Sequence, residues 1–251
     1  MDTTRQVKRI RVANIGVDIV PEDSLEEVVK GMLEDGDRHQ IVLLSLLDLI
    51  KARHNRELER TVKEASLVIP ISRGIVRGAK FLGRELPVRY MPFEFVIKLL
   101  GILEKNKRSV YLLGGRPNDL QVAASNLRAS FPELSIVGRC AGYYSKPMEK
   151  NIVIAIKKAS PSLVLSGNGL PSRTRDVWVA NNKRNFHPGI YLWCWECFDI
   201  FSGRRQKPSR RSWERGTNTY SENLRKPWRL LRGFLYLYYG IVLLIHRLRR
   251  L

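Results

Sequence analysis

The feature that most constrains the fold of this chain is the alternation of short apolar runs with longer amphipathic stretches between residues 10 and 200. The apolar runs have the length of buried strands, and the stretches between them have the period of helices. This alternation predicts an α/β fold with a mostly parallel, Rossmann-like sheet and helices on both faces. The predicted strands cover residues 40–44, 67–70, 109–113, 134–137, 163–166 and 190–194, after a strand or hairpin over 10–20. The predicted helices cover 25–34, 46–65, 74–83, 92–106, 118–130, 147–159 and 173–184. The first of them begins with a capping-box pattern, Ser24-Leu25-Glu26-Glu27.

Positive charge is concentrated in the last part of the chain. The sequence has 44 Lys and Arg against 24 Asp and Glu, a net charge of +20, and thirteen of these cations lie in residues 203–251 with only two acids. Such an excess predicts an anionic partner, which is phosphate, nucleic acid or an acidic membrane. We therefore divide the chain into an α/β domain over 1–202 and a basic appendage over 203–251. The first part of the appendage, 203–223, has the composition of a linker or a mobile segment.

The uncharged run from Gly233 to His246 is too short to span a bilayer. As a helix it rises about 21 Å, whereas the hydrocarbon core is roughly 30 Å thick. It carries an apolar stripe with arginines at both ends, a pattern typical of a helix that lies on anionic lipid. The alternative is a terminal helix that packs on the protein's own core or on a second subunit. The residues predicted to meet the membrane are Arg225, Trp228, Arg229, Arg232, Leu235, Tyr238, Val242, Ile245 and Arg247.

Two glycine-containing loops follow predicted strands, and ligands bind at the carboxyl ends of parallel strands. Gly114 and Gly115 end one strand just before a helix, an arrangement that lets backbone approach a phosphate. Asn168 and Gly169 end another strand, with Arg173 close behind. The alternatives are a plain tight turn for the first loop and a solvated basic helix start for the second.

The cysteines and histidines do not suggest a cofactor site. Cys194-Trp195-Glu196-Cys197 has no second ligand pair beside it, so we expect Cys194 and Cys197 to be buried core residues and predict no metal and no cofactor. Three cysteines do not make a disulfide framework, and no apolar stretch follows Met1, so we expect a protein of the reducing cytosol without a secretory signal.

The order of these loops resembles the WecG/TagA/CpsF glycosyltransferases over residues 10 to 232. The residues that carry the resemblance are Asn14-Ile15-Gly16-Val17, Pro70, Gly74-Ile75, Arg89, Tyr111 to Gly115, Val137-Gly138, Gly142-Tyr143-Tyr144, Gly169, Pro171, Phe198-Asp199-Ile200, Gly203 and Pro227. The resemblance implies transfer of an N-acetylhexosamine, typically N-acetylmannosamine, from UDP to an undecaprenyl-diphosphate-linked sugar, without a metal. It also implies attachment to the cytoplasmic face of the membrane through the C-terminal appendage. A nucleic-acid partner is disfavoured, because the cations flank an apolar stripe and no nucleic-acid-binding module is present.

Several positions that the resemblance assigns to chemistry are changed. The aspartate proposed as general base in the family is replaced by Ile71, which cannot accept a proton. Glu222 stands where the family has a phosphate-binding arginine. We therefore predict a non-catalytic member that acts as a scaffold or partner in cell-envelope assembly, with a protein partner or a second copy of itself. The alternative is an active transferase that binds a UDP-sugar. The residues predicted to hold a ligand are Arg73, Arg89, Gly114, Gly115, Asn168, Gly169 and Arg173; Asp48, Ser72 and Glu94 are candidates for replacement chemistry that no spacing singles out.

Overall fold

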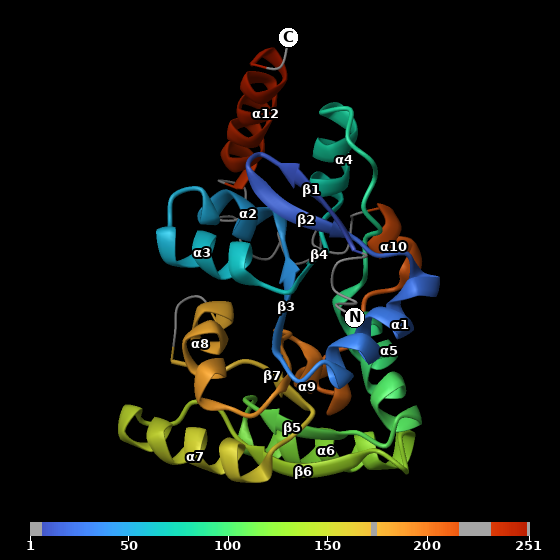
Figure 1. The fold of residues 1–251 in the computed structure, drawn as a ribbon, viewed down its shortest axis with the longest axis vertical. Helices are drawn as coiled ribbons and strands as arrows, with labels where there is room; N and C mark the ends of the chain where they lie inside the picture. The colour runs from blue at the N-terminus through green and yellow to red at the C-terminus, as the bar shows by residue number, and fades with distance from the viewer. Residues whose placement is uncertain (1–6, 172–174, 216–231, 250–251) are drawn as a thin grey trace.

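The centre of the protein is a six-stranded parallel sheet with strand order β4-β3-β8-β7-β5-β6 (Figure 1). The structure, a computed structural model, describes residues 7–171, 175–215 and 232–249. The strands are β3 (Arg38–Leu44), β4 (Leu67–Pro70), β5 (Ser109–Leu113), β6 (Ser135–Cys140), β7 (Leu163–Ser166) and β8 (Gly189–Trp193). The predicted α/β fold with a mostly parallel sheet is confirmed.

A two-stranded hairpin precedes the sheet, which confirms one of the two alternatives for residues 10–20. β1 (Lys8–Val12) and β2 (Ile15–Ile19) pair antiparallel through a turn in which Ala13 and Asn14 both have positive φ, as two-residue hairpin turns require. The buried Asp18 carboxylate accepts hydrogen bonds from the Arg9 guanidinium and, at 2.6 Å, from the Val68 amide. This carboxylate therefore fixes the hairpin against β4.

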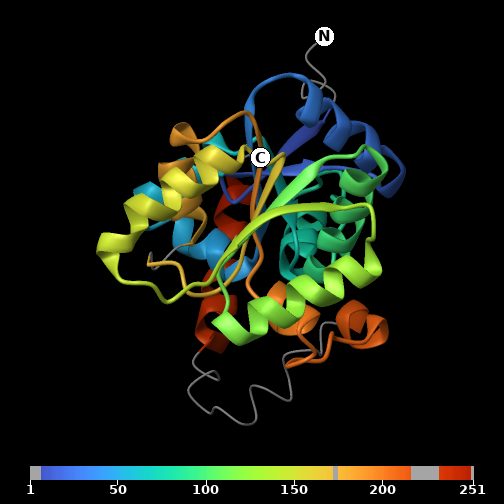
Figure 2. The same cartoon turned by 90° about the horizontal axis from the view of Figure 1, so that it is seen from below.

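Helices cover both faces of the sheet, which is strongly twisted in the view from below (Figure 2). The core under the first face includes Ile41 and Leu43, and the core under the second includes Val42 and Leu44, as the alternation of a strand requires. The first face is covered by α1 (Leu25–Glu34), α5 (Pro92–Lys105), α6 (Pro117–Ser130) and α9 (Cys197–Phe201). The second is covered by α2 (Leu46–Ala52), α3 (Arg56–Glu64), α4 (Arg73–Phe81), α7 (Glu149–Ala159), α8 (Arg175–Asn182) and α12 (Arg232–Leu248). The other helices within the described residues are α10 (Arg210–Arg215), η2 (Glu22–Ser24), η3 (Lys146–Met148) and η4 (Lys183–Asn185).

Two local predictions were wrong. Ser24 does not cap α1, because η2 runs directly into the helix and leaves Ser24 with a helical backbone and no side-chain capping bond. The single helix predicted over 46–65 is two helices. Asn55 separates them, because its side chain accepts a hydrogen bond from the Leu58 amide at 3.0 Å and so starts α3.

The C-terminal helix α12 packs one face on the body and leaves the opposite face uncovered (Figure 1). Tyr239, Val242 and Leu243 are buried in the core that α2 and α4 share. The Tyr239 hydroxyl lies 3.3 Å from the Gly74 carbonyl oxygen, to which it donates, and it lies where a Cβ on Gly78 would be. No helix in residues 7–171, 175–215 and 232–249 has the length and apolarity needed to cross a bilayer.

The structure differs from the predicted membrane stripe at Val242, which is buried, and at Tyr238, which is half-buried and hydrogen-bonded to His54. Leu235, Ile245 and Arg247 are exposed. The helix is apolar on nearly every side, so periodicity alone did not identify the face that packs. The uncovered apolar face consists of Phe234, Leu237, Ile241, Leu244 and Leu248, which recur every three or four residues. Arg225, Trp228 and Arg229 lie outside the described residues, and the side chain of Arg232 is not described.

Candidate functional site

The loops that follow β5, β6 and β7 meet at the carboxyl edge of the sheet. The Gly115 amide donates to the Asn168 carbonyl at 2.7 Å, and the Tyr143 amide donates to the Gly169 carbonyl at 2.8 Å. The Gly114 amide donates to the Cys140 carbonyl at 2.8 Å. The glycines of these loops, here called the glycine cluster, are Gly114, Gly115, Gly142, Gly167 and Gly169. The structure thus brings together four of the predicted ligand-binding residues, Gly114, Gly115, Asn168 and Gly169. The amides of Gly114 and Gly115 donate to carbonyls of neighbouring loops.

Close packing explains why this cluster consists of glycine. A Cβ on Gly167 would lie 2.5 Å from Cδ2 of Phe198, and one on Gly114 would lie 2.7 Å from the Asn168 carbonyl oxygen. Phe198 belongs to α9, which packs on α6. The N-terminal turn of α6 carries Asp119, whose carboxylate pairs with Arg204 at 3.1 Å. In this structure the absence of a Cβ at Gly114 and Gly115 therefore lets the loops and α9 pack closely together.

The outer surface of the cluster offers groups suited to a planar ligand. The Tyr143 ring is 65% exposed, on a backbone with φ of +58°. The Asn168 Oδ1 atom is buried, with no hydrogen-bond partner in the described part of the chain. Trp195, two residues after the end of β8, is 48% exposed. An exposed aromatic ring is a surface on which nucleobases stack.

The Cys194 and Cys197 thiols lie in the core, as predicted. Their side chains are 3% and 0% exposed, and the Cys197 thiol donates to the Cys194 carbonyl at 3.1 Å. Burial raises the pKa of the Cys197 thiol above its ordinary value, which keeps it protonated and unreactive. Among the residues that the structure describes, no group of three or more His, Cys, Asp and Glu side chains is arranged to hold a metal ion.

A second part of the site lies at the end of β4, where Arg73 and Arg89 bind α10. The Tyr90 amide donates to the Pro70 carbonyl, which places Arg89 beside the end of this strand. Arg89 Nη2 donates to the Trp213 carbonyl at 2.7 Å, and its guanidinium stacks on the Trp213 ring at 4.4 Å from the centroid. Arg73 Nη1 donates to the Arg215 carbonyl at 3.0 Å. Burial, and next the charge of Arg73, lower the pKa of Arg89, so two cations lie close together here.

Ile71 follows Pro70 at the end of the same strand. Ile71 is half-buried, packs on the core and donates its amide to the Leu44 carbonyl at 3.0 Å. Arg173 lies outside the described residues. Part of the segment predicted as a linker is ordered. Residues 210–215 form α10, and Arg73 and Arg89 bind its carbonyl groups. The division of the chain at residue 202 stays a prediction.

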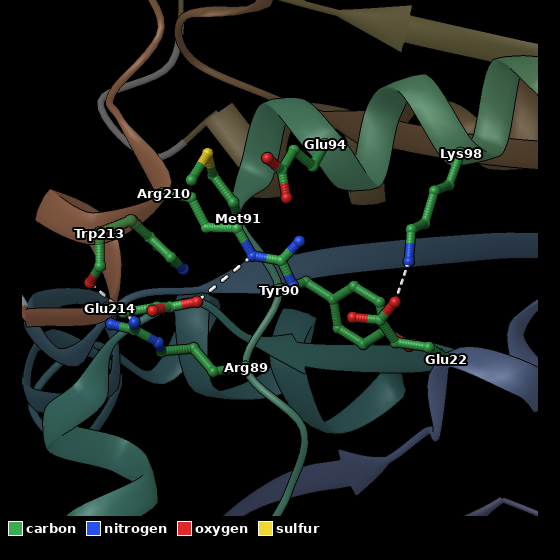
Figure 3. Close-up of a pocket in the computed structure, with 9 residues that line it drawn as sticks. All are labelled: Glu22, Arg89, Tyr90, Met91, Glu94, Lys98, Arg210, Trp213 and Glu214. Atoms are coloured by element: carbon green, nitrogen blue, oxygen red, sulfur yellow. Dashed lines mark hydrogen bonds and ion pairs between the residues drawn. The ribbon is translucent and has the colours of Figure 1, made fainter.

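A cavity of about 250 Å³ opens between α5 and α10 beside Arg89 (Figure 3). Most of the charges around it are paired: Arg210 with Glu214 at 3.3 Å, and Lys98 with Glu22. Glu94 is half-buried, and Figure 3 shows its carboxylate pointing into the cavity. The lining residues are Glu22, Arg89, Tyr90, Met91, Glu94, Lys98, Arg210, Trp213 and Glu214. Sequence reasoning missed Trp213 and Arg210; the one available signal was a tryptophan in an otherwise polar, basic segment.

A buried carboxyl group, Asp176, lies at the start of α8. Its Oδ1 atom has no hydrogen-bond partner within the described ranges, and the backbone carbonyl of the same residue accepts from Gln40 at 2.8 Å. Burial, and then the charge of Asp48, raise the pKa of Asp176 well above its ordinary value. The folded state therefore holds a proton that the unfolded chain releases.

This proton makes stability fall as pH rises. The protonated Asp176 contributes fully to the free energy of unfolding below the unfolded-state pKa of roughly 3.9. This contribution is lost as pH rises from there to the raised pKa of the folded state. We expect Asp176→Asn to increase the free energy of unfolding at pH 7 by roughly 1–3 kcal/mol, and the difference to shrink towards pH 4. Urea unfolding at both pH values measures this, with the exposed Asp23→Asn as control. A destabilised Asp176→Asn at pH 7 would contradict the expectation.

Comparison with known proteins identifies a matching family and similar proteins in two bacteria. The family model described as "Glycosyl transferase WecG/TagA/CpsF family" matches residues 10–251. An N-acetylglucosaminyldiphosphoundecaprenol N-acetyl-beta-D-mannosaminyltransferase of Bacillus subtilis (strain 168) is 22% identical over 181 residues, which cover 71% of this chain and 68% of the relative. A protein of the same description from Staphylococcus aureus (strain NCTC 8325 / PS 47) is 23% identical over 154 residues, covering 61% of this chain and 59% of that relative. The second match thus spans less than two thirds of the relative's length.

Proposed function

The chain belongs to the WecG/TagA/CpsF glycosyltransferase family, and we propose that it transfers an N-acetylhexosamine from a UDP-sugar to a polyprenyl-diphosphate-linked sugar. The proposed site of action is the cytoplasmic face of a membrane, in the synthesis of a cell-surface polysaccharide. The relatives named above, whose descriptions state this acceptor and an N-acetylmannosaminyl group, support the substrate class.

The observation that carries the proposal is the pair Arg73 and Arg89 at the end of β4, beside a cavity. Guanidinium groups bind phosphate through several N–H donors in one plane. The hydrogen bond from Arg89 to Trp213 uses one of these donors. We therefore assign the acceptor's diphosphate to this pair, with the acceptor sugar in the cavity.

The nucleotide is assigned to the outer surface of the glycine cluster. There the exposed Tyr143 ring offers a surface on which the base can stack. These loops and the end of β4 both face the carboxyl edge of the sheet, so the donor and the acceptor approach from the same side.

The uncovered face of α12 supports attachment to a membrane. Five large apolar side chains are exposed along it, more than a soluble helix normally leaves in water. Arg77 and Lys80 are exposed on the neighbouring α4, and the Arg247 guanidinium lies over the Phe81 ring at 4.8 Å. Cations close to an exposed apolar stripe favour anionic lipid.

A non-catalytic scaffold is the competing function. Ile71 at the position of the family's base favours it, and so does the binding of α10 carbonyls by both Arg73 and Arg89. In that case the arginines would fix the appendage and bind no substrate.

Release of UDP distinguishes the two functions. We expect the full-length protein to release UDP from UDP-N-acetylmannosamine when a polyprenyl-diphosphate N-acetylglucosamine is supplied in anionic vesicles, and to bind UDP in calorimetry. Arg89→Ala should lower the rate by about tenfold or more, because the diphosphate loses a charge-assisted contact. Absence of both UDP release and UDP binding would instead favour the scaffold.

A further inference from the structure

We propose that Glu94 is the catalytic base of the transfer, the group that accepts the proton of the attacking sugar hydroxyl. This inference rests on the proposed transferase function. Ile71 cannot accept a proton, so the transfer needs a base elsewhere. Glycosyl transfer to a hydroxyl gains about two to four powers of ten in rate from a positioned base.

Glu94 is placed where the acceptor hydroxyl would lie. It occupies the first turn of α5, lines the cavity that α10 covers and points into it (Figure 3). Arg89, the proposed diphosphate ligand, lines the same cavity. A base must come within hydrogen-bond reach of the proton that it removes, and a sugar held by its diphosphate at Arg89 would bring its hydroxyls into this space.

The Glu94 carboxylate has lone pairs available for a proton. In the described part of the chain no hydrogen bond or ion pair reaches this side chain. The other carboxylates of the cavity, Glu22 and Glu214, are each paired with a cation. A carboxylate that already binds a cation has fewer lone pairs free for the hydroxyl of a sugar.

The other candidates for replacement chemistry have structural roles. The Asp48 carboxylate accepts from the Ser45 hydroxyl, and that hydroxyl accepts from the Asp48 amide at 3.1 Å, so Asp48 supports the N-cap of α2. The Ser72 hydroxyl accepts from the Leu46 amide at 3.0 Å. Glu94 is thus the candidate that these contacts leave for chemistry.

The step balances without any further reactant. The acceptor oxygen forms a bond to the anomeric carbon of the N-acetylhexosamine as its O–H proton passes to a Glu94 carboxylate oxygen. The bond from the anomeric carbon to the UDP oxygen breaks, and UDP leaves with the electron pair. The protonated Glu94 then returns its proton to solvent.

A competing role for Glu94 is to stabilise α5, since an acidic residue in the first turn interacts favourably with the helix dipole. The isosteric Glu94→Gln removes the charge, so a matched control is needed. Glu27→Gln provides it, because Glu27 is an exposed acid in the first turn of α1, which does not line the cavity.

The test measures UDP release by full-length wild type, Glu94→Gln and Glu27→Gln with UDP-N-acetylmannosamine and the lipid-linked acceptor in vesicles. We expect Glu94→Gln to lower kcat by about 10²- to 10⁴-fold with UDP affinity unchanged. Glu27→Gln should keep the wild-type rate. Melting temperatures of all three proteins show whether folding has changed.

Two outcomes would overturn the role of Glu94, and they are distinguishable. If wild type turns over and folded Glu94→Gln keeps the wild-type kcat, the base is another group and the proposed function stands. If wild type shows no turnover at all, the proposed function fails and the role of Glu94 fails with it.

Discussion

We expect a variant with Phe234, Leu237 and Ile241 all changed to serine to lose at least about a hundredfold in affinity for anionic vesicles. These side chains are 69%, 66% and 58% exposed on the uncovered face of α12, so they contribute nothing to the core. Insertion of each into the interface would bury apolar area worth about 1.5 kcal/mol or more. Vesicle flotation at low and physiological salt measures the loss.

The control must remove equally exposed apolar groups from another surface. Val122, Met148 and Ile154 are 45%, 51% and 51% exposed on or beside α6 and α7, and their combined change to serine should leave flotation unchanged. Unfolding by urea should be nearly the same for wild type and both triple variants. Flotation of the α12 variant at the wild-type level would contradict the membrane assignment.

The strands and loops that are formed by residues close together in the sequence were predicted well. β4, β5 and β7 have the predicted bounds, because buried runs such as 67–70 consist of apolar residues that fit a parallel strand and end at proline or glycine. The carboxyl-edge loops could therefore be located in advance. The split of 46–65 was missed because Asn55 acts through a capping bond that hydrophobic periodicity does not register.

Contacts between distant segments could not be predicted in the same way. Arg89 and Trp213 are 124 residues apart, and nothing in the pattern around either residue indicates that they meet. The face of α12 that packs on the body was missed for a related reason. The surface of α2 and α4 determines which of the two apolar faces packs, and the Tyr239 hydroxyl fills the space above Gly78 on this surface. The cavity at Glu94 depends on the first of these contacts, because both Arg89 and Trp213 line it.

We expect Gly142→Ala to destabilise the protein by about 3 kcal/mol or more. A Cβ at this position would lie 2.5 Å from the Asn168 carbonyl oxygen and 2.9 Å from the Gly169 Cα, and both atoms belong to backbone that cannot turn aside. Gly142 does not have a positive φ, so the loss would come from contact alone. Urea unfolding measures it.

The matched control for Gly142→Ala is Gly240→Ala in α12. A Cβ there meets nothing within 4 Å, and alanine in a helix interior is favoured over glycine by about 0.5–1 kcal/mol, so this variant should be slightly more stable than wild type. Gly142→Ala should also weaken UDP binding, because the Tyr143 amide bonds to the Gly169 carbonyl and the clash separates these loops. A Gly142→Ala protein as stable as wild type would contradict the packing role of the glycine cluster.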